Sequence, residues 1–413
     1  MIEAGGRRFR AIALAVVVLG LAGRAAVMTP LLRSPPGDPD NYLMLASSLA
    51  EGRGLRSFGR PTAYRPPLYP IALAPGVLLF GPTPTPWVVA LNLAAGGAAI
   101  ALTGLAARRW GLPGRSTLLA MLVVALDPVL VSQARGVMTE SLASALVAGM
   151  LAACSPRPSL RSSAALGTVG GLAALCRPSL LPAAGLIALA LLLRGPGRWP
   201  DRLGRSSVML AALAATLSPW AIRNAFAVGA PVWTTTHGGY TLYLANNHAY
   251  YDDVLDGDLP VWTGANQRRW FAEVTRLGEG KSEPESDRLF RERALRVMRS
   301  RPGDFARATL GRLGRFWAIA PSSAVYPGPL RLATAAWTAP LWVLLGAGLL
   351  RPWSRRWPAI AAVAVALALT IVHSLYWTDL RMRAPAVPAI ALVAAGAVSG
   401  RPAGRSHTPG LGS

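Results

Sequence analysis

The sequence predicts an all-α protein that crosses a membrane many times, and three observations support this fold class. Apolar residues make up 52% of the 413 positions and charged residues only 15%, whereas a soluble protein carries about a quarter charged residues. Apolar stretches of the length that crosses hydrocarbon recur along the whole chain. Clusters of arginine separate these stretches, as in the cytoplasmic loops of membrane proteins. The net charge of +23 therefore indicates membrane topology rather than nucleic-acid binding.

Ten apolar stretches are predicted to span the bilayer. The first, Ala11 to Thr29, follows a cluster of three arginines and is interpreted as an uncleaved helix rather than a signal peptide, because many further spans follow it. The other nine are expected near 87–107, 116–134, 138–154, 163–176, 179–193, 206–228, 332–350, 358–375 and 384–399.

The distribution of charge predicts the orientation of these spans. With the N-terminus inside, the cytoplasmic segments contain clusters of arginine and only two acidic residues, Glu3 and Asp201. If the spans were assigned wrongly, basic and acidic residues would not separate in this way. The positive-inside rule therefore favours this assignment of the spans and this orientation. Both termini are therefore predicted to be cytoplasmic.

Residues 1–400 are predicted to form a single transmembrane domain with two long external segments and a flexible cytoplasmic tail, 401–413. The first segment, 30–86, contains an apolar piece from Leu68 to Phe80 that is too short to span and is expected at the interface. The second segment, 229–307, ends in a stretch with apolar residues at helical spacing. From Asp287 to Arg301 we expect an amphipathic helix on the membrane surface.

Charged residues collect on the predicted external side, where each needs a reason because charge is costly at a membrane. A guanidinium binds phosphate in bidentate geometry, so arginines here indicate a lipid phosphate. Any one of them could equally snorkel or pair with a nearby acid. A carboxylate beside several arginines suits group transfer from a phosphate leaving group. The candidates are Asp38, Asp40, Arg135, Glu140, Arg177, Arg223, Asp379, Arg381 and Arg383.

Other signatures of catalysis are weak. The sequence contains neither a phosphate-cradling Walker loop nor a Gly-x-Ser-x-Gly elbow, and its four histidines form no helical metal-binding pair. Two alternatives stay open. A transporter or lipid flippase would place polar residues or broken helices near the middle of the bilayer. A non-catalytic scaffold subunit would tolerate loss of Asp38.

Six short motifs, in order, resemble the GT-C glycosyltransferases. The nearest group is the dolichyl-phosphate-mannose protein mannosyltransferases and their bacterial relatives, including the aminoarabinose transferases of lipid A. Each motif is weak alone, but together they cover roughly residues 35 to 390. They are Asp38-Pro-Asp-Asn-Tyr42, Tyr64-Arg-Pro-Pro-Leu-Tyr-Pro70, Thr139-Glu140, Cys176-Arg-Pro-Ser179, Pro219-Trp-Ala-Ile-Arg-Asn224 and Arg381-Met-Arg-Ala-Pro385.

The resemblance implies a GT-C-like helix bundle in a bacterial inner membrane and a polyprenyl-phosphate-linked sugar as donor. The acceptor would be an extracytoplasmic protein, lipid or glycan. Asp38 would be the general base, with inversion at the anomeric carbon, and Glu140 would orient the acceptor or substitute for a second acid. Arg381, Arg383 and Arg135 would bind the phosphate of the donor. The other residues expected to bind substrate are Tyr42, Arg65, Arg177 and Arg223.

Three departures from the family pattern leave parts of this assignment open. Pro39 and Tyr64 stand where relatives carry glutamate, and Met382 replaces an aromatic residue. The use of a divalent metal is therefore undecided, and Asp40 is a credible substitute for Asp38 as the base.

Overall fold

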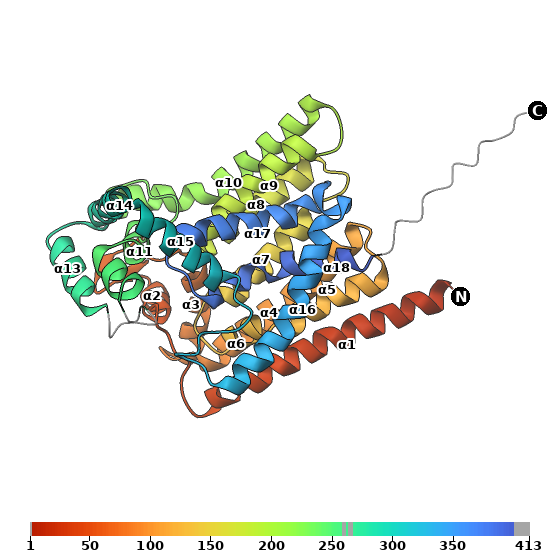
Figure 1. Cartoon of the computed structure of the whole chain (residues 1–413), viewed down its shortest axis with the longest axis horizontal. Helices are drawn as coiled ribbons and strands as arrows, with labels where there is room; N and C mark the ends of the chain where they lie inside the picture. Colours follow the sequence, from red (N-terminus) through yellow and green to blue (C-terminus); the bar gives the residue numbers. More distant parts are fainter. Residues whose placement is uncertain (1, 258–261, 263–266, 400–413) are drawn as a thin grey trace, which may run out of the picture.

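The computed structural model describes residues 2–257, 262 and 267–399, and these are almost entirely helical. A bundle of helices runs along the long axis of the molecule (Figure 1). Its helices are α1 (Ile2–Met28), α4 (Thr85–Arg109), α5 (Gly114–Leu126), α6 (Pro128–Gln133), α7 (Glu140–Ala153), α8 (Leu160–Cys176), α9 (Leu181–Arg194), α10 (Trp199–Ala227), α16 (Gly328–Leu350), α17 (Ile360–Leu375) and α18 (Val387–Ala397), with short turns η1 (Thr29–Leu32), η2 (Pro178–Leu180), η4 (Pro352–Arg355) and η5 (Leu380–Ala386). The predicted tail, 401–413, lies outside the described residues.

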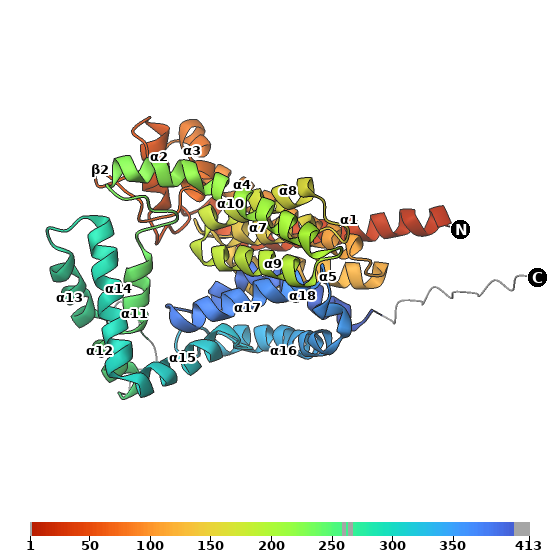
Figure 2. The ribbon, with the colours of Figure 1, turned by 90° about the horizontal axis from the view of Figure 1, so that it is seen from above.

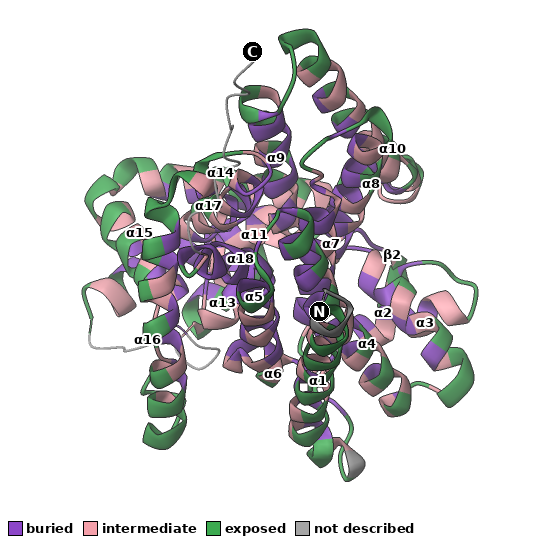
Figure 3. Cartoon of the chain, turned by 90° about the vertical axis from the view of Figure 1, so that its right-hand side faces the viewer, coloured by how far each residue is buried: buried purple, intermediate pink, exposed green. Residues whose placement is uncertain are grey.

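The bundle has the composition of a multi-pass membrane protein. Among the described residues, four helical segments are long and apolar enough to cross a membrane: Gly6–Leu31, Thr85–Arg109, Gly328–Leu350 and Leu380–Ala397. Several shorter apolar helices accompany them. Large apolar side chains lie exposed on the outer helices α1 and α16, while buried residues gather toward the middle (Figure 3). The fold class is as predicted, and the count of ten spans stays a prediction.

The interior of the bundle depends on small residues. Every residue of α18 is buried. A Cβ atom added at Gly348 of α16 would lie 2.1 Å from the carbonyl oxygen of Val393 in α18, so only glycine permits this approach. Such small-residue contacts are typical of helices that pack within a membrane.

The third predicted span, 116–134, is wrong as a single helix. The chain breaks at Asp127, and α5 and α6 lie on either side of the break. Pro128 disfavours helical geometry in the residue before it, and the Asp127 carboxylate accepts a hydrogen bond from the backbone N–H of Leu130 (2.9 Å), which caps α6.

Residues 29–84 form a first loop region. It contains α2 (Tyr42–Ala50), a two-residue antiparallel hairpin of β1 (Arg56–Ser57) and β2 (Arg60–Pro61), and α3 (Leu68–Phe80). The helix α3 has the bounds of the predicted apolar piece and exposes Leu78 and Leu79. Its position at the membrane interface stays a prediction.

Residues 228–327 form a second loop region with a small core of its own, which includes Tyr243, Trp270 and Phe290. The predicted amphipathic helix is present as α14. Its apolar face, with Phe290, Ala294 and Val297, is buried in that core, and its membrane-surface position stays a prediction. The region's elements are α11 (Gly238–Ala245), α12 (His248–Tyr250), η3 (Tyr251–Leu255), α13 (Arg268–Gly278), α14 (Glu283–Ser300) and α15 (Pro302–Phe316).

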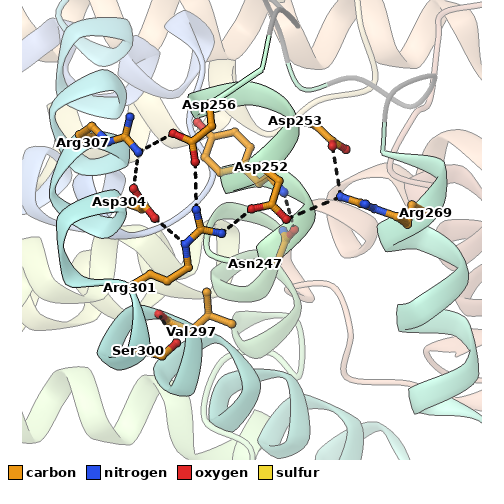
Figure 4. A network of polar contacts seen from close by, with 11 residues as sticks. Asn247, Asp252, Asp253, Asp256, Arg269, Val297, Ser300, Arg301, Asp304 and Arg307 are labelled. Carbon is orange, nitrogen blue, oxygen red and sulfur yellow. Dashed lines mark hydrogen bonds and ion pairs between the residues drawn. The ribbon is translucent and has the colours of Figure 1, made fainter.

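An ion-pair network ties the elements of the second loop region together (Figure 4). Arg301 binds Asp252, Asp256 (3.0 Å) and Asp304. Arg307 binds Asp256 (2.6 Å) as well as Asp304. The network joins η3 to the junction between α14 and α15.

Both loop regions lie at one end of the bundle, which we call the loop end (Figures 1 and 2). The start of α1 and the end of α18 lie at the opposite end. The structure therefore agrees with the predicted placement of the two long segments on one side and the termini on the other. Which side faces the cytoplasm stays a prediction.

Candidate active site

Asp38 lies at the loop end, where the chain enters α2. Its carboxylate accepts hydrogen bonds from the backbone N–H groups of Tyr42 (2.9 Å) and Leu43 (2.7 Å). Burial raises the pKa of this carboxyl above its ordinary value of 3.8, although the two N–H groups and Arg65 act to lower it. A carboxyl with a raised pKa is better matched to general-base catalysis than an ordinary aspartate.

Asp40 forms an ion pair with Arg65, at 2.8 Å between Oδ1 and a guanidinium nitrogen. Both side chains are about one-fifth exposed, at 23% and 21%. The Arg65 guanidinium also lies over the rings of Tyr42 (5.9 Å) and Tyr64 (5.4 Å). Three residues predicted to act on substrate, Asp40, Tyr42 and Arg65, are thus brought together.

Glu140 begins α7 and forms an ion pair with Arg177 (3.0 Å) at the junction of α8 and η2. The Glu140 side chain is only 1% exposed. Arg177 also donates to the Thr139 hydroxyl (3.2 Å) and contacts the sulfur of Met382. A buried charge must be paired, and the ion pair provides this for Glu140, although neither of its carboxylate oxygens accepts a hydrogen bond from the described residues.

Arg381 connects these two ion pairs. Its guanidinium donates to Asp379 (3.2 Å) and interacts electrostatically with the carboxylates of Glu140 and Asp40. The side chain is 31% exposed, so the guanidinium keeps access to further ligands.

Arg381 also lines a cavity of about 710 Å³ between α6, α15, the start of α16 and η5. The lining of the cavity includes apolar residues such as Val129 and Leu330. It also includes the two further cations Arg315 and Arg331. A cavity of this size is typical of small-molecule sites, and its three arginines suit an anionic group.

The sequence analysis missed Arg315 and Arg331. Arg331 immediately precedes a predicted span on the external side, so the signal that identified the other external arginines could have found it. Arg315 lies within α15, whose position beside the cavity depends on the fold. It donates to the Tyr250 hydroxyl at 2.9 Å.

Two of the predicted arginines use their guanidinium groups on backbone carbonyls. Arg383, which is 1% exposed, donates to Phe316 (3.2 Å) and Ala318 (2.8 Å). Arg223 donates to Leu55 (2.8 Å) and Thr62 (2.7 Å). These contacts stabilise the segments around the site.

Arg135 is exposed at the end of α6 and does not line the 710 Å³ cavity, although two neighbours, Ser132 and Gln133, do. Direct contacts of Arg135, Arg223 and Arg383 with substrate stay predictions. Within residues 2–257, 262 and 267–399, no three His, Cys, Asp or Glu side chains are grouped so that they could hold a metal ion.

The arrangement of helices is similar to that of solved membrane-protein structures. An archaeal oligosaccharyltransferase, AglB of Archaeoglobus fulgidus, superposes with a TM-score of 0.52 at 14% identity. That structure is a complex with an inhibitory peptide and a dolichol-phosphate. The match covers 92% of this chain and 50% of that one, so the chain spans about half the length of the oligosaccharyltransferase.

The apo form of the same enzyme gives a TM-score of 0.53 over 94% of this chain. A second similar structure is ArnT of Cupriavidus metallidurans bound to undecaprenyl phosphate, at 17% identity and a TM-score of 0.41, covering 97% of this chain and 78% of that one. Neither a protein-family model nor a curated protein sequence matches the chain.

Proposed function

We propose that this protein is a membrane glycosyltransferase that moves a sugar from a polyprenyl-phosphate donor to an acceptor on the extracytoplasmic side. The observation that carries the proposal is the position of Arg381. It lines the 710 Å³ cavity and also interacts with the carboxylates of Asp40 and Glu140. A phosphate held by Arg381 would therefore lie beside the acids that could act on an acceptor.

The cavity suits such a donor. Its apolar lining residues, such as Val129 and Leu330, can contact the isoprenoid chain, and its arginines can bind the phosphate. The dolichol-phosphate in the oligosaccharyltransferase complex supports this ligand class, since that protein has the same fold. The donor sugar would then lie toward the cluster of Asp38, Asp40 and Glu140.

In the proposed reaction, the carboxylate of Asp38 takes the proton of the acceptor hydroxyl. The acceptor oxygen attacks the anomeric carbon, and the bond from that carbon to the phosphate oxygen breaks. The electron pair of this bond stays on the phosphate, which leaves as polyprenyl phosphate, and the anomeric configuration inverts. Arg381, with Arg315 and Arg331, stabilises the charge that develops on the phosphate.

Asp40 is the alternative base, because it lies beside Asp38 and acts on it electrostatically. Arg65 would orient Asp40, and Glu140 would orient the acceptor through the Arg177 pair. We propose a bacterial inner membrane on the family resemblance, and cytoplasmic termini on the charge distribution of the sequence.

The phosphate site is tested with undecaprenyl phosphate as the probe and the purified full chain in nanodiscs. Arg381→Gln should bind it about 10- to 100-fold more weakly, because a hydrogen bond to a charged group contributes about 1.5–3 kcal/mol. Arg194→Gln is the matched control, since Arg194 is an exposed arginine at the end of α9. Equal affinity in wild type and Arg381→Gln would contradict the assignment.

The reaction itself is tested by mass spectrometry of envelope glycans from a deletion strain. A missing sugar, restored by the wild-type gene, supports a transferase. Movement of lipid-linked sugar across proteoliposome membranes, with no new glycosidic bond, would favour a transporter or lipid flippase instead.

A further inference from the structure

The segment from Leu55 to Arg65 is held between the bundle and the second loop region. On the bundle side, Arg223 of α10 donates to the carbonyl oxygens of Leu55 and Thr62. On the other side, a hydrogen bond from the backbone N–H of Thr236 reaches the carbonyl oxygen of Ala63 (3.0 Å). The segment is thus fixed by residues that lie far from it in the sequence.

Glu283, at the start of α14, completes this contact. One oxygen of its carboxylate accepts hydrogen bonds from the backbone N–H of Ala63 (2.9 Å) and from the hydroxyl of Thr236 (3.0 Å). Ala63 is fully buried and Thr236 is 4% exposed. Bonds to a charged acceptor are about twice as strong as neutral ones, so this carboxylate is a strong tie between the two loop regions.

Glu283 binds Ala63, which lies two residues before Arg65 of the Asp40–Arg65 ion pair. The residue between Ala63 and Arg65 is Tyr64, whose ring packs edge-on against His237 with 4.3 Å between ring centroids. Burial lowers the pKa of His237 well below its ordinary value, so this ring is neutral and adds no charge beside Arg65. The path of the backbone through residues 62–64 therefore sets where the Arg65 guanidinium lies.

We infer that Glu283 is a positioning residue for the active site: by binding Ala63 and Thr236, it fixes Arg65 against Asp40 and couples α14 of the second loop region to the catalytic segment. This inference rests on the proposed function. Glu283 does not touch substrate in this scheme and acts only through Arg65.

Loss of this tie has a chemical consequence that a purely structural role lacks. The charged groups that act on Asp38 are Asp40, which raises its pKa, and Arg65, which lowers it. When Arg65 moves away, the Asp38 carboxylate loses a counter-charge and its pKa rises. The acidic limb of the pH–rate profile then moves to higher pH.

The test compares Glu283→Gln with Glu285→Gln. Glu285 lies on the same helix but binds only Ser282 at the helix start, so it controls for effects on α14. Initial rates are measured in permeabilised membranes of the deletion strain, whose own lipid-linked sugars and envelope serve as substrates. Glu283→Gln should lower the rate about 10-fold and move the acidic limb upward, while Glu285→Gln should leave both unchanged. The milder Thr236→Val should act in the same direction with a smaller effect.

Hydrogen exchange of the backbone N–H groups of residues 62–65 provides a readout that needs no activity. Faster exchange in Glu283→Gln together with the shifted limb supports the inference. Unchanged exchange, or faster exchange with an unchanged limb, overturns it. If wild-type membranes transfer no sugar while the exchange effect is present, the proposed function has failed, and the positioning role falls with it.

Discussion

Two groups of ion pairs at the loop end consist of the same residue types, aspartate or glutamate with arginine, but have different roles. The network around Arg301 lies at the surface, and Asp252, Asp256 and Asp304 surround its guanidinium (Figure 4). The Glu140–Arg177 pair is more deeply buried, with side chains 1% and 13% exposed, whereas the Asp40–Arg65 pair is exposed to about the same degree as Arg301 and Asp304. Both of these carboxylates also interact electrostatically with Arg381, which lines the 710 Å³ cavity. Exposed pairs are worth little individually, so the position beside the cavity, more than burial, distinguishes the candidate reaction centre from the surface network.

The largest difference between the two groups should appear in activity. Asp38→Asn should reduce sugar transfer by about 100-fold or more, because a general base contributes about 10²–10⁴-fold. Asp304→Asn, in the surface network, should leave the rate within about twofold. Transfer rates in membranes of the deletion strain, normalised to protein amount, measure both. If Asp38→Asn is active and Asp40→Asn is inactive, Asp40 is the base.

Stability should separate the groups next. Glu140→Gln leaves Arg177 without its carboxylate, and breaking a buried pair costs about 3–5 kcal/mol; we expect the low end of this range because Arg177 is 13% exposed. The double variant Glu140→Gln/Arg177→Gln should recover part of the loss. Thermal unfolding of the purified protein measures these changes. A double variant as unstable as the sum of the single ones would show that the two residues do not interact.

Acid should affect the two groups in opposite ways. Burial raises the pKa of Asp38, so as pH falls this carboxylate is protonated in the folded protein already above pH 3.8. Activity is lost on this protonation because the base is no longer charged. The same protonation stabilises the folded state relative to the unfolded state. Hydrogen bonds from Arg307 and Arg301 lower the pKa of Asp304, so its stabilising effect is present above pH 3.8 and is lost as pH falls through the lowered value. As pH is lowered, the transfer rate should therefore decline first and the melting temperature at lower pH. If both decline at the same pH, the assignment of Asp38 as the base is contradicted.

The smallest effect should come from Arg301→Gln. Two of its three partners, Asp252 and Asp256, are exposed, so the melting temperature should fall slightly and the difference from wild type should shrink in high salt. The affinity for undecaprenyl phosphate should not change. Arg381→Gln, which weakens that affinity, is the comparison. A loss of affinity in Arg301→Gln would join the surface network to the donor site.

Much of the fold could be predicted from the sequence because membrane helices are encoded locally. Apolar length and charge asymmetry predicted the bundle and the two loop regions. The break at Asp127 was missed because apolar residues continue on both sides of it, so hydropathy hid the effect of Pro128. The apolar period of α14 was predicted correctly, but the burial of this face in the second loop region was not. The sequence does not say whether such a face contacts lipid or a neighbouring helix.

The candidate site could be predicted only in part. Asp38, Asp40 and Tyr42 are neighbours in the chain, so a motif could identify them together. The pairing of Glu140 with Arg177 and the position of Arg381 beside both pairs depend on tertiary packing. Glu283 lies 220 residues from its partner Ala63, and no local pattern connects such positions.

The placement of the chain ends constrains the topology further. The start of α1 and the end of α18 lie at the same end of the bundle (Figure 1), and a path that returns to its side of departure has made an even number of crossings. An even number of passes, such as the predicted ten, is therefore expected. Reporter enzymes fused to either terminus should then be active in the same compartment.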